Sequence, residues 1–158
     1  MLERNSGEIQ TPSYCNFLFK LIVHPVKIMT LFMILCLYLA FRAKQFVCDF
    51  LLQTDWMAMT KGMPGVPGYR ALLSHAAVHG MGTLFIMLVF VPQMWWLGFV
   101  DLVFHALVDR LKGMITYRRG WKYTDRWFWW SFGMDQEAHN LTHLAYILLI
   151  LSQTGILF

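Results

Sequence analysis

Side chains of the kinds that bind metal ions recur in four apolar segments of this sequence, each time four residues apart. The four pairs are Asp49 and Gln53, His75 and His79, His105 and Asp109, and His139 and His143. Residues i and i+4 share one face of an α-helix, so each segment is expected to direct its pair to one side. Polar side chains in an apolar helix cost free energy unless they are partnered, and their repetition indicates a shared site.

The residue types predict the chemistry of this site. Imidazole and carboxylate groups together favour a divalent ion such as zinc, manganese or iron. The predicted metal ligands are Asp49, His75, His79, His105, Asp109, Asp135, His139 and His143. This set exceeds the four ligands of a structural zinc ion, so we expect one ion with an open coordination position or two ions. The alternative for any single pair is an interhelical hydrogen-bonding contact, and Gln53 fits that role as well as it fits a ligand.

Two residues are predicted to act on a substrate. Asp109 is the predicted catalytic carboxylate, and Lys112 lies one helical turn beyond it, where it either holds an anionic substrate group or pairs with Asp109. A path to the ions is expected between the helix ends. Its predicted floor is Asp49, His75, Asp109 and Asp135, and its predicted rim is Lys112 and the tryptophan-rich loop.

The composition indicates one small integral membrane domain. Of the 158 residues, 58% are hydrophobic and 14% charged, against about 25% charged in soluble domains. The three cysteines are isolated, which argues against a disulfide framework and a thiolate zinc site. The net charge of +4 is modest and unevenly placed, so it favours membrane orientation over nucleic-acid binding.

Apolar length predicts the spans, since a helix needs about 20 residues to cross a bilayer. The expected fold is all-α, a multi-pass bundle of four transmembrane helices. The predicted spans are 28–53, 70–91, 94–115 and 134–156, with turns at 61–68 and at Val91-Pro92-Gln93. Residues 1–27 are expected to form an N-terminal tail and 28–158 the transmembrane domain. The charged and aromatic residues 116–133 are expected to form an amphipathic segment at the membrane interface.

In an up-down-up-down bundle all four polar pairs fall in the same leaflet, within roughly 15 Å of one surface. Basic residues in the connections predict which surface this is. Eight lie on the side of the pairs, namely Lys61, Arg70, Arg110, Lys112, Arg118, Arg119, Lys122 and Arg126. Three lie on the other side, namely Arg4, Lys20 and Lys27. The site is therefore predicted to open toward the cytoplasm, with both termini outside.

Four blocks of sequence resemble a known family. They are similar, in the same order, to blocks of small bacterial and phage inner-membrane proteins classed as domain of unknown function 3307. The four blocks are Gln45–Trp56, His75–His79, His105–Lys112 and Asp135–His139. That family often has a histidine where this chain has Gln45. The resemblance implies a multi-pass protein of the bacterial inner membrane and supports the site, but it implies no activity. The blocks are also loosely similar to membrane-embedded metal-dependent hydrolases, which is an analogy of fold.

These observations give three functional hypotheses. The first is a membrane metallohydrolase acting on a phosphate-bearing or lipidic substrate at the cytoplasmic leaflet, with anionic groups attracted by the basic loop 110–126. The second is a non-catalytic metal-binding or ion-conducting bundle, as an accessory subunit of a larger membrane complex or a homo-oligomer. The third is a haem carrier using two histidines, against which the aspartates on the same faces argue. The expected partners are the lipid bilayer and an anionic or lipidic substrate, and no nucleic acid.

Overall fold

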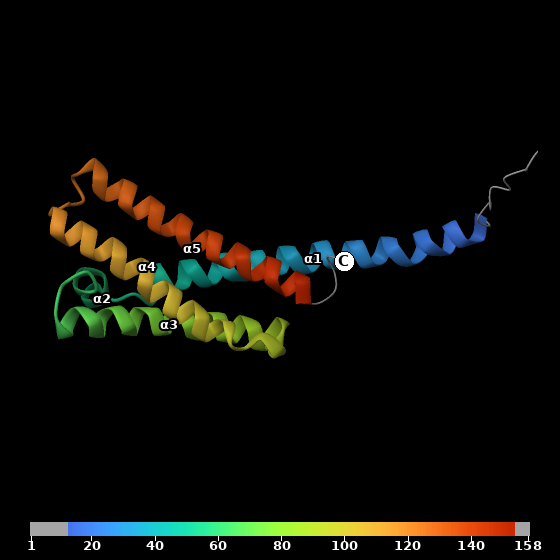
Figure 1. The fold of residues 1–158 in the computed structure, drawn as a ribbon, viewed down its shortest axis with the longest axis horizontal. Coiled ribbons are helices and arrows are strands. Elements are labelled where there is room, and N and C mark those ends of the chain that lie inside the picture. Colours follow the sequence, from blue (N-terminus) through green and yellow to red (C-terminus); the bar gives the residue numbers. More distant parts are fainter. Residues whose placement is uncertain (1–12, 154–158) are drawn as a thin grey trace, which may run out of the picture. The chain divides into compact units, whose positions relative to one another are not determined.

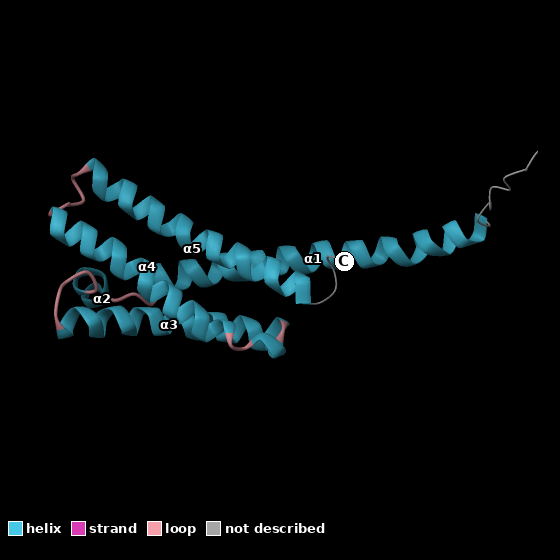
Figure 2. Cartoon of the chain, in the orientation of Figure 1, coloured by secondary structure: helices cyan, strands magenta, loops and turns pink. Residues whose placement is uncertain are grey.

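The computed structural model describes residues 13–153, with side chains from Thr30 onward. Within this range the chain is helical and contains no strand, which confirms the all-α prediction (Figures 1 and 2). The elements are α1 (Ser13–Phe46), a π-helical turn (Val47–Leu51), α2 (Asp55–Thr60), α3 (Val66–Phe90), a 3-10 turn (Pro92–Met94), α4 (Leu97–Arg119) and α5 (Arg126–Gln153).

The chain divides into two units, residues 1–34 and 35–158, and the division falls within α1. The first unit contributes the beginning of this helix. The expected tail 1–27 is helical from Ser13 onward, while residues 1–12, including Arg4, lie outside the described residues. The second unit holds every residue of the predicted site, so the site can be described within one unit.

Glycine and proline set the helix ends. Gly65 precedes α3 with φ +86°, a conformation that favours glycine, and Pro67 occupies the first turn. Pro92 follows the end of α3, and a 3-10 turn leads to α4, so the predicted turn at Val91-Pro92-Gln93 is confirmed. Gly120 ends α4 in the left-handed conformation with φ +65°.

The separate interfacial segment predicted over 116–133 was wrong. Residues 116–119 continue α4, residues 126–133 begin α5, and only 120–125 connect the two helices. The prediction ended each helix where its apolar run ended, but apolar length limits only the part of a helix that can lie in hydrocarbon. The helix itself continues until Gly120 and begins again at Arg126.

The pairing of Asp49 with Gln53 on one helical face was also wrong. The α-helix gives way after Phe46 to the π-helical turn, in which the amide of Leu52 donates to the carbonyl of Val47 at 2.9 Å. The chain then leaves the helix, so Gln53 lies in the connection to α2. A π-turn inside a helix is uncommon and often occurs at functional sites.

Among the described residues, two helical segments are long and apolar enough to cross a membrane, namely Thr30–Leu51 and Val66–Phe90. The described parts of the other two expected spans, 94–115 and 134–156, do not pass this test. Charged residues such as Asp101, Asp109 and Lys112 lower the hydropathy of α4, and α5 carries Asp135 and Glu137. Length and apolarity alone therefore support two possible spans and not four.

Helices α3 and α4 approach closely at a pair of glycines (Figure 1). A Cβ atom on Gly98 would lie 2.8 Å from the Leu84 Cβ and 2.9 Å from the Gly80 carbonyl oxygen. A Cβ atom on Gly80 would lie 2.8 Å from the Gly98 carbonyl oxygen. Because these neighbours are backbone or the first side-chain carbon, they cannot turn away. The two glycines therefore set the distance between the helices that carry half of the predicted ligands.

We expect Gly98→Ala to destabilise the protein by about 1–3 kcal/mol, because the added methyl group overpacks this contact. The matched control is Gly133→Ala in α5, where a Cβ atom would meet nothing within 4 Å. That change should be neutral or slightly stabilising. Thermal unfolding of the two variants in detergent measures the difference. Equal midpoints would show that α3 and α4 are not held at this distance.

Candidate metal centre

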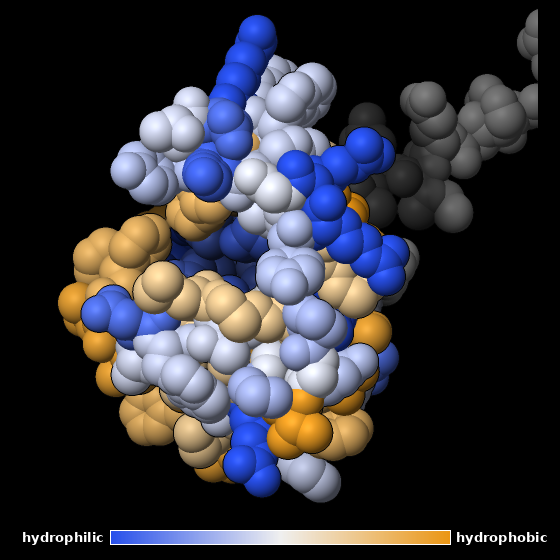
Figure 3. Space-filling view, turned by 90° about the vertical axis from the view of Figure 1, so that its left-hand side faces the viewer, coloured by the Kyte–Doolittle hydropathy of each residue, from blue (hydrophilic) through white to orange (hydrophobic). Residues whose placement is uncertain are grey.

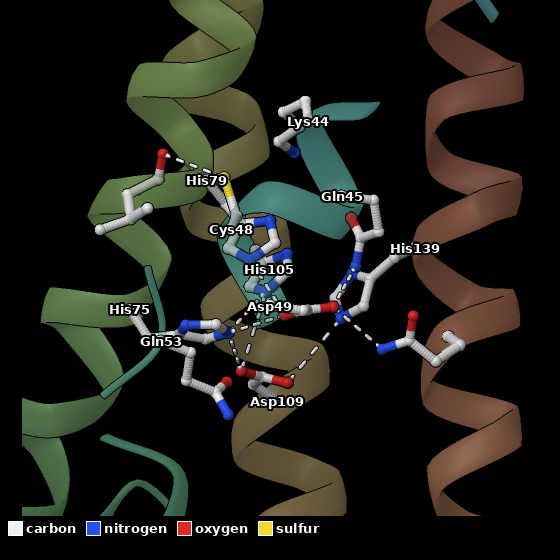
Figure 4. Close-up of polar contacts among 12 residues, drawn as sticks. Lys44, Gln45, Cys48, Asp49, Gln53, His75, His79, His105, Asp109 and His139 are labelled. Atoms are coloured by element: carbon white, nitrogen blue, oxygen red, sulfur yellow. Dashed lines mark hydrogen bonds and ion pairs between the residues drawn. The ribbon is translucent and has the colours of Figure 1, made fainter. Parts of the chain in front are cut away.

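Histidines and aspartates from four helical segments meet inside the bundle (Figure 4). The first group joins Asp49 of the π-turn, His75 and His79 of α3, and His105 of α4. The second group joins His105 and Asp109 of α4 with His139 of α5. In each group the potential ligand atoms lie within 4.8 Å of one another. The histidines and Asp109 are almost completely buried, and Asp49 is partly exposed.

The distances between these atoms are those expected around a metal ion. The Asp49 Oδ1 atom lies 3.3 Å from His75 Nε2 and 3.2 Å from His79 Nε2. His75 Nε2 lies 3.4 Å from both His105 Nε2 and the Asp109 Oδ2 atom. Metal–ligand bonds of about 2.0–2.1 Å in a tetrahedron place neighbouring ligand atoms about 3.3 Å apart. The residues therefore fit a zinc-sized divalent ion.

Hydrogen bonding alone does not account for this arrangement. His75 Nε2 has three close neighbours, on Asp49, Asp109 and His105. A ring nitrogen carries at most one hydrogen, so it can donate to one of them. The convergence of several ring nitrogens and carboxylate oxygens on one point is more typical of a ligand set than of a hydrogen-bonded cluster.

A second position lies beside His139. Its Nε2 atom is 3.8 Å from the Asp109 Oδ1 atom and 3.6 Å from the Asp135 Oδ1 atom. His139 Nε2 and Asp135 Oδ1 are buried and have no hydrogen-bond partner among the described residues. Buried polar atoms are normally satisfied, so the orphaned atoms indicate where a second ion would bind. Asp109, with one oxygen toward each position, lies where a bridging carboxylate would.

Each aspartate in the interior is held in the same way. Its Oδ2 atom accepts a hydrogen bond from a lysine or glutamine, and its Oδ1 atom faces a histidine. The Oδ2 donors are Gln45 and Gln136 for Asp49, Lys44 for Asp101, Lys61 for Asp109, and Lys112 for Asp135. Such contacts fix the orientation of a carboxylate and leave one oxygen for another partner.

With every histidine neutral, the charges of the interior do not balance. Four aspartates contribute −4 and the three lysines +3, so the net charge is −1 when the histidines are neutral. A charge removed from water is costly unless it is compensated. One divalent ion would change the net charge to +1, so binding of one ion is compatible with this interior. Two ions would change the net charge to +3, which would favour the binding of an anion as well.

Two predicted ligands belong to neither group, namely Asp135, which lies beside His139, and His143, which lies apart. His143 Nε2 contacts Lys44 Nζ at 3.1 Å and lies 3.8 Å from the Asp101 Oδ1 atom, and its ring stacks on Phe41 at 4.8 Å. Lys44 Nζ is 2.7 Å from the Asp101 Oδ2 atom, which also accepts from Thr83. A lysine ammonium thus occupies the position between the carboxylate and the imidazole.

Two residues of this interior were not predicted from the sequence. Lys44 and Lys61 are both buried against aspartates. Gln53, which was a candidate ligand, accepts a hydrogen bond from Lys61 at 3.1 Å. A lysine inside an apolar segment was the available signal for Lys44, because such a charge requires a buried partner.

A cavity of about 650 Å³ reaches the centre from the end where α4 and α5 are joined. Figure 3 looks at this end and shows a hollow with a hydrophilic floor. The lining includes Asp49, Asp135, Lys112 and Trp121, which confirms this part of the predicted path. His75 and Asp109, also predicted for the floor, do not line the cavity and are completely buried.

The sequence model of the family described as protein of unknown function (DUF3307) matches residues 34–157. The chain belongs to the DUF3307 family. The matched range contains every residue of the centre and of the cavity. Membership in DUF3307 agrees with the resemblance noted in the sequence, but the description of the family gives no activity. Among curated proteins and solved structures, none matches the chain.

We expect His79→Ala and Asp109→Ala each to weaken metal binding by roughly 10-fold or more, because losing a direct ligand costs at least as much as losing a residue that supports one. The control is Asp55→Ala, at the exposed start of α2. Titration of chelator-treated protein with Zn²⁺, followed by calorimetry, measures the affinities. Equal affinities in all three variants would leave the histidines as interhelical contacts only.

Proposed function

We propose that this protein is a metal-dependent hydrolase embedded in the bacterial inner membrane, which acts on a phosphate-bearing or lipidic substrate at the cytoplasmic leaflet. The observation that carries the proposal is a cavity whose lining includes Asp49, one member of a buried set of convergent histidines and aspartates. A catalytic ion needs an open position and a path for substrate. The cavity supplies the path, and Asp49 and Asp135 belong to both the cavity and the centre.

Integration into a membrane is supported by the distribution of polarity. The interior holds lysines, histidines and aspartates beside an apolar core, and every long helix also exposes large apolar side chains. Examples are Leu39 of α1, Phe85 of α3, Phe99 and Leu107 of α4, and Leu148 of α5, each more than half exposed. Soluble monomers rarely expose apolar patches of more than a few hundred Å². We therefore propose that α4 and α5 also cross the bilayer, with their charged residues turned inward.

The proposed chemistry is distributed among named side chains. A bound divalent ion would supply a water of pKa about 7 and polarise the scissile bond. Asp109, held by Lys61 at 2.7 Å, keeps one oxygen toward His139. Lys112 is partly exposed and lies on the cavity wall, where its ammonium group can contact an anionic substrate group. Asp109 as a ligand and Lys112 as a substrate contact are thus the proposed catalytic residues.

The proposed topology has both chain ends outside and the α4–α5 hairpin in the cytoplasm, following the excess of basic residues on the side of the site. Alkaline phosphatase fused after Phe158 should therefore be active, whereas the enzyme inserted at Lys122 should be inactive. Immunoblots of both fusions control for expression. The reverse pattern would place the cavity on the outer side and exclude a cytoplasmic substrate.

Hydrolysis should depend on both the ion and Asp109. We expect detergent-purified protein loaded with Zn²⁺ or Mn²⁺ to release inorganic phosphate from phosphate esters, and chelation to abolish this release. Asp109→Asn, which keeps the size of the side chain but removes its charge, should lower the rate by at least about 100-fold. Thermal unfolding of the same variant checks its fold. Metal binding without turnover would favour the accessory, non-catalytic role.

A further inference from the structure

The cavity changes in character along its length. On α4 its lining runs from Lys112 through Thr116 to Tyr117, with Trp121 in the connection that follows, and on α5 from Asp135 through Phe132 to Phe128. Both series begin beside the centre and proceed toward the hairpin. With a rise of 1.5 Å per residue, their helical parts extend about 8 Å and about 10 Å, respectively. The polar part of the cavity therefore lies against the centre, and the aromatic part lies at the mouth.

The polar floor has hydrogen-bond donors to spare. Lys112 carries three N–H groups, and Asp135 is its one hydrogen-bond acceptor among the described residues, at 3.1 Å. The Lys112 ammonium also lies 5.4 Å from the centre of the Phe132 ring. This lysine thus stands at the boundary between the polar and aromatic parts, where it can contact an anionic group.

Charge alone would not draw an anion into this cavity. Its lining holds two lysines, Lys61 and Lys112, and two aspartates, Asp49 and Asp135. These charges cancel, and Asp109 lies buried just behind them. An anion is favoured only when a divalent ion has been added to the centre, so occupancy of the cavity should follow metal binding.

We propose that the substrate is a phosphate monoester of a compact aromatic alcohol, which enters phosphate first from the hairpin end. This inference rests on the proposed function. The phosphate would lie on the floor beside Lys112, and the aromatic group would lie among Phe128, Phe132 and Trp121 in the mouth. Water adds to phosphorus, the phosphorus–oxygen bond to the alcohol breaks, and the alcohol leaves with one proton of that water, giving inorganic phosphate.

The same geometry disfavours a two-chain phospholipid. With its phosphate on the floor, its acyl chains would have to leave through the mouth at the hairpin. The hairpin carries Arg118, Arg119, Lys122, Asp125 and Arg126, which belong in water or among lipid head groups. Acyl chains directed there would leave the hydrocarbon, which costs about 0.8 kcal/mol per CH₂ group.

The test compares 1-naphthyl phosphate with vesicles containing phosphatidic acid, using full-length Zn²⁺-loaded protein. We expect naphthyl phosphate to have the higher kcat/KM. Phe132→Ala and Phe128→Ala should each lower it by roughly 10-fold, mainly through KM, because the aromatic contact is made before and during the reaction. The control Phe99→Ala removes an exposed ring on α4 that does not line the cavity and should leave kcat/KM unchanged.

Binding provides an independent readout. Naphthyl phosphate should bind the Zn²⁺-loaded protein and quench its tryptophan fluorescence. Its affinity should be at least 10-fold lower after chelation, and Trp121→Phe should reduce the quenching. Faster turnover of phosphatidic acid, or equal KM values in the Phe128, Phe132 and Phe99 variants, would overturn the inference and leave the hydrolase standing. Absence of turnover of both substrates by metal-loaded protein would overturn both proposals.

Discussion

The burial of four aspartates is the constraint on which the rest of the structure depends. A carboxylate taken out of water is costly unless hydrogen bonds and opposite charges compensate for it. Here the compensation comes from other segments, with Lys44 in α1, Lys61 before α3, and Lys112 in α4 each bonded to an aspartate Oδ2 atom. These contacts tie the helices together, and they also fix the orientation of each carboxylate relative to the histidines.

The polar groups in the interior are accompanied by large apolar side chains on the exterior. Some apolar side chains form a buried core, among them Leu37, Phe41 and Met87, but many large ones are exposed on every long helix. In the proposed membrane location, lipid gives apolar helices no hydrophobic reason to associate, so close backbone packing and polar contacts must hold them together instead. The Gly80–Gly98 contact and the lysine–aspartate pairs provide both. The centre is thus part of what assembles the bundle, as well as a possible site of chemistry.

The spacing of residues predicted the helical nature of the chain and much of the site, because i and i+4 positions share a face wherever the helix is regular. Contacts from distant segments could not be predicted in this way. Lys44 and Lys61 find aspartates 57 and 48 residues away in the chain, which no local pattern encodes. His139 and His143 illustrate the limit of the pattern itself. One helical turn separates them by about 6 Å along the axis, which is enough to give one of them Asp109 and the other Asp101 as a neighbour.

The π-helical turn makes the length of one short segment matter more than its composition. Lys44 and Asp49 are five residues apart, which in a regular α-helix would turn them about 140° from each other. The wider turn at Val47–Leu51, with its i to i+5 hydrogen bond, brings both toward the interior. Phe50 and Leu51 in this turn are exposed and replaceable by other apolar residues. A regular α-helix of the same length would therefore separate the Lys44–Asp101 network from the metal centre, whereas one that is a single residue shorter would keep Lys44 and Asp49 within about 40° of each other.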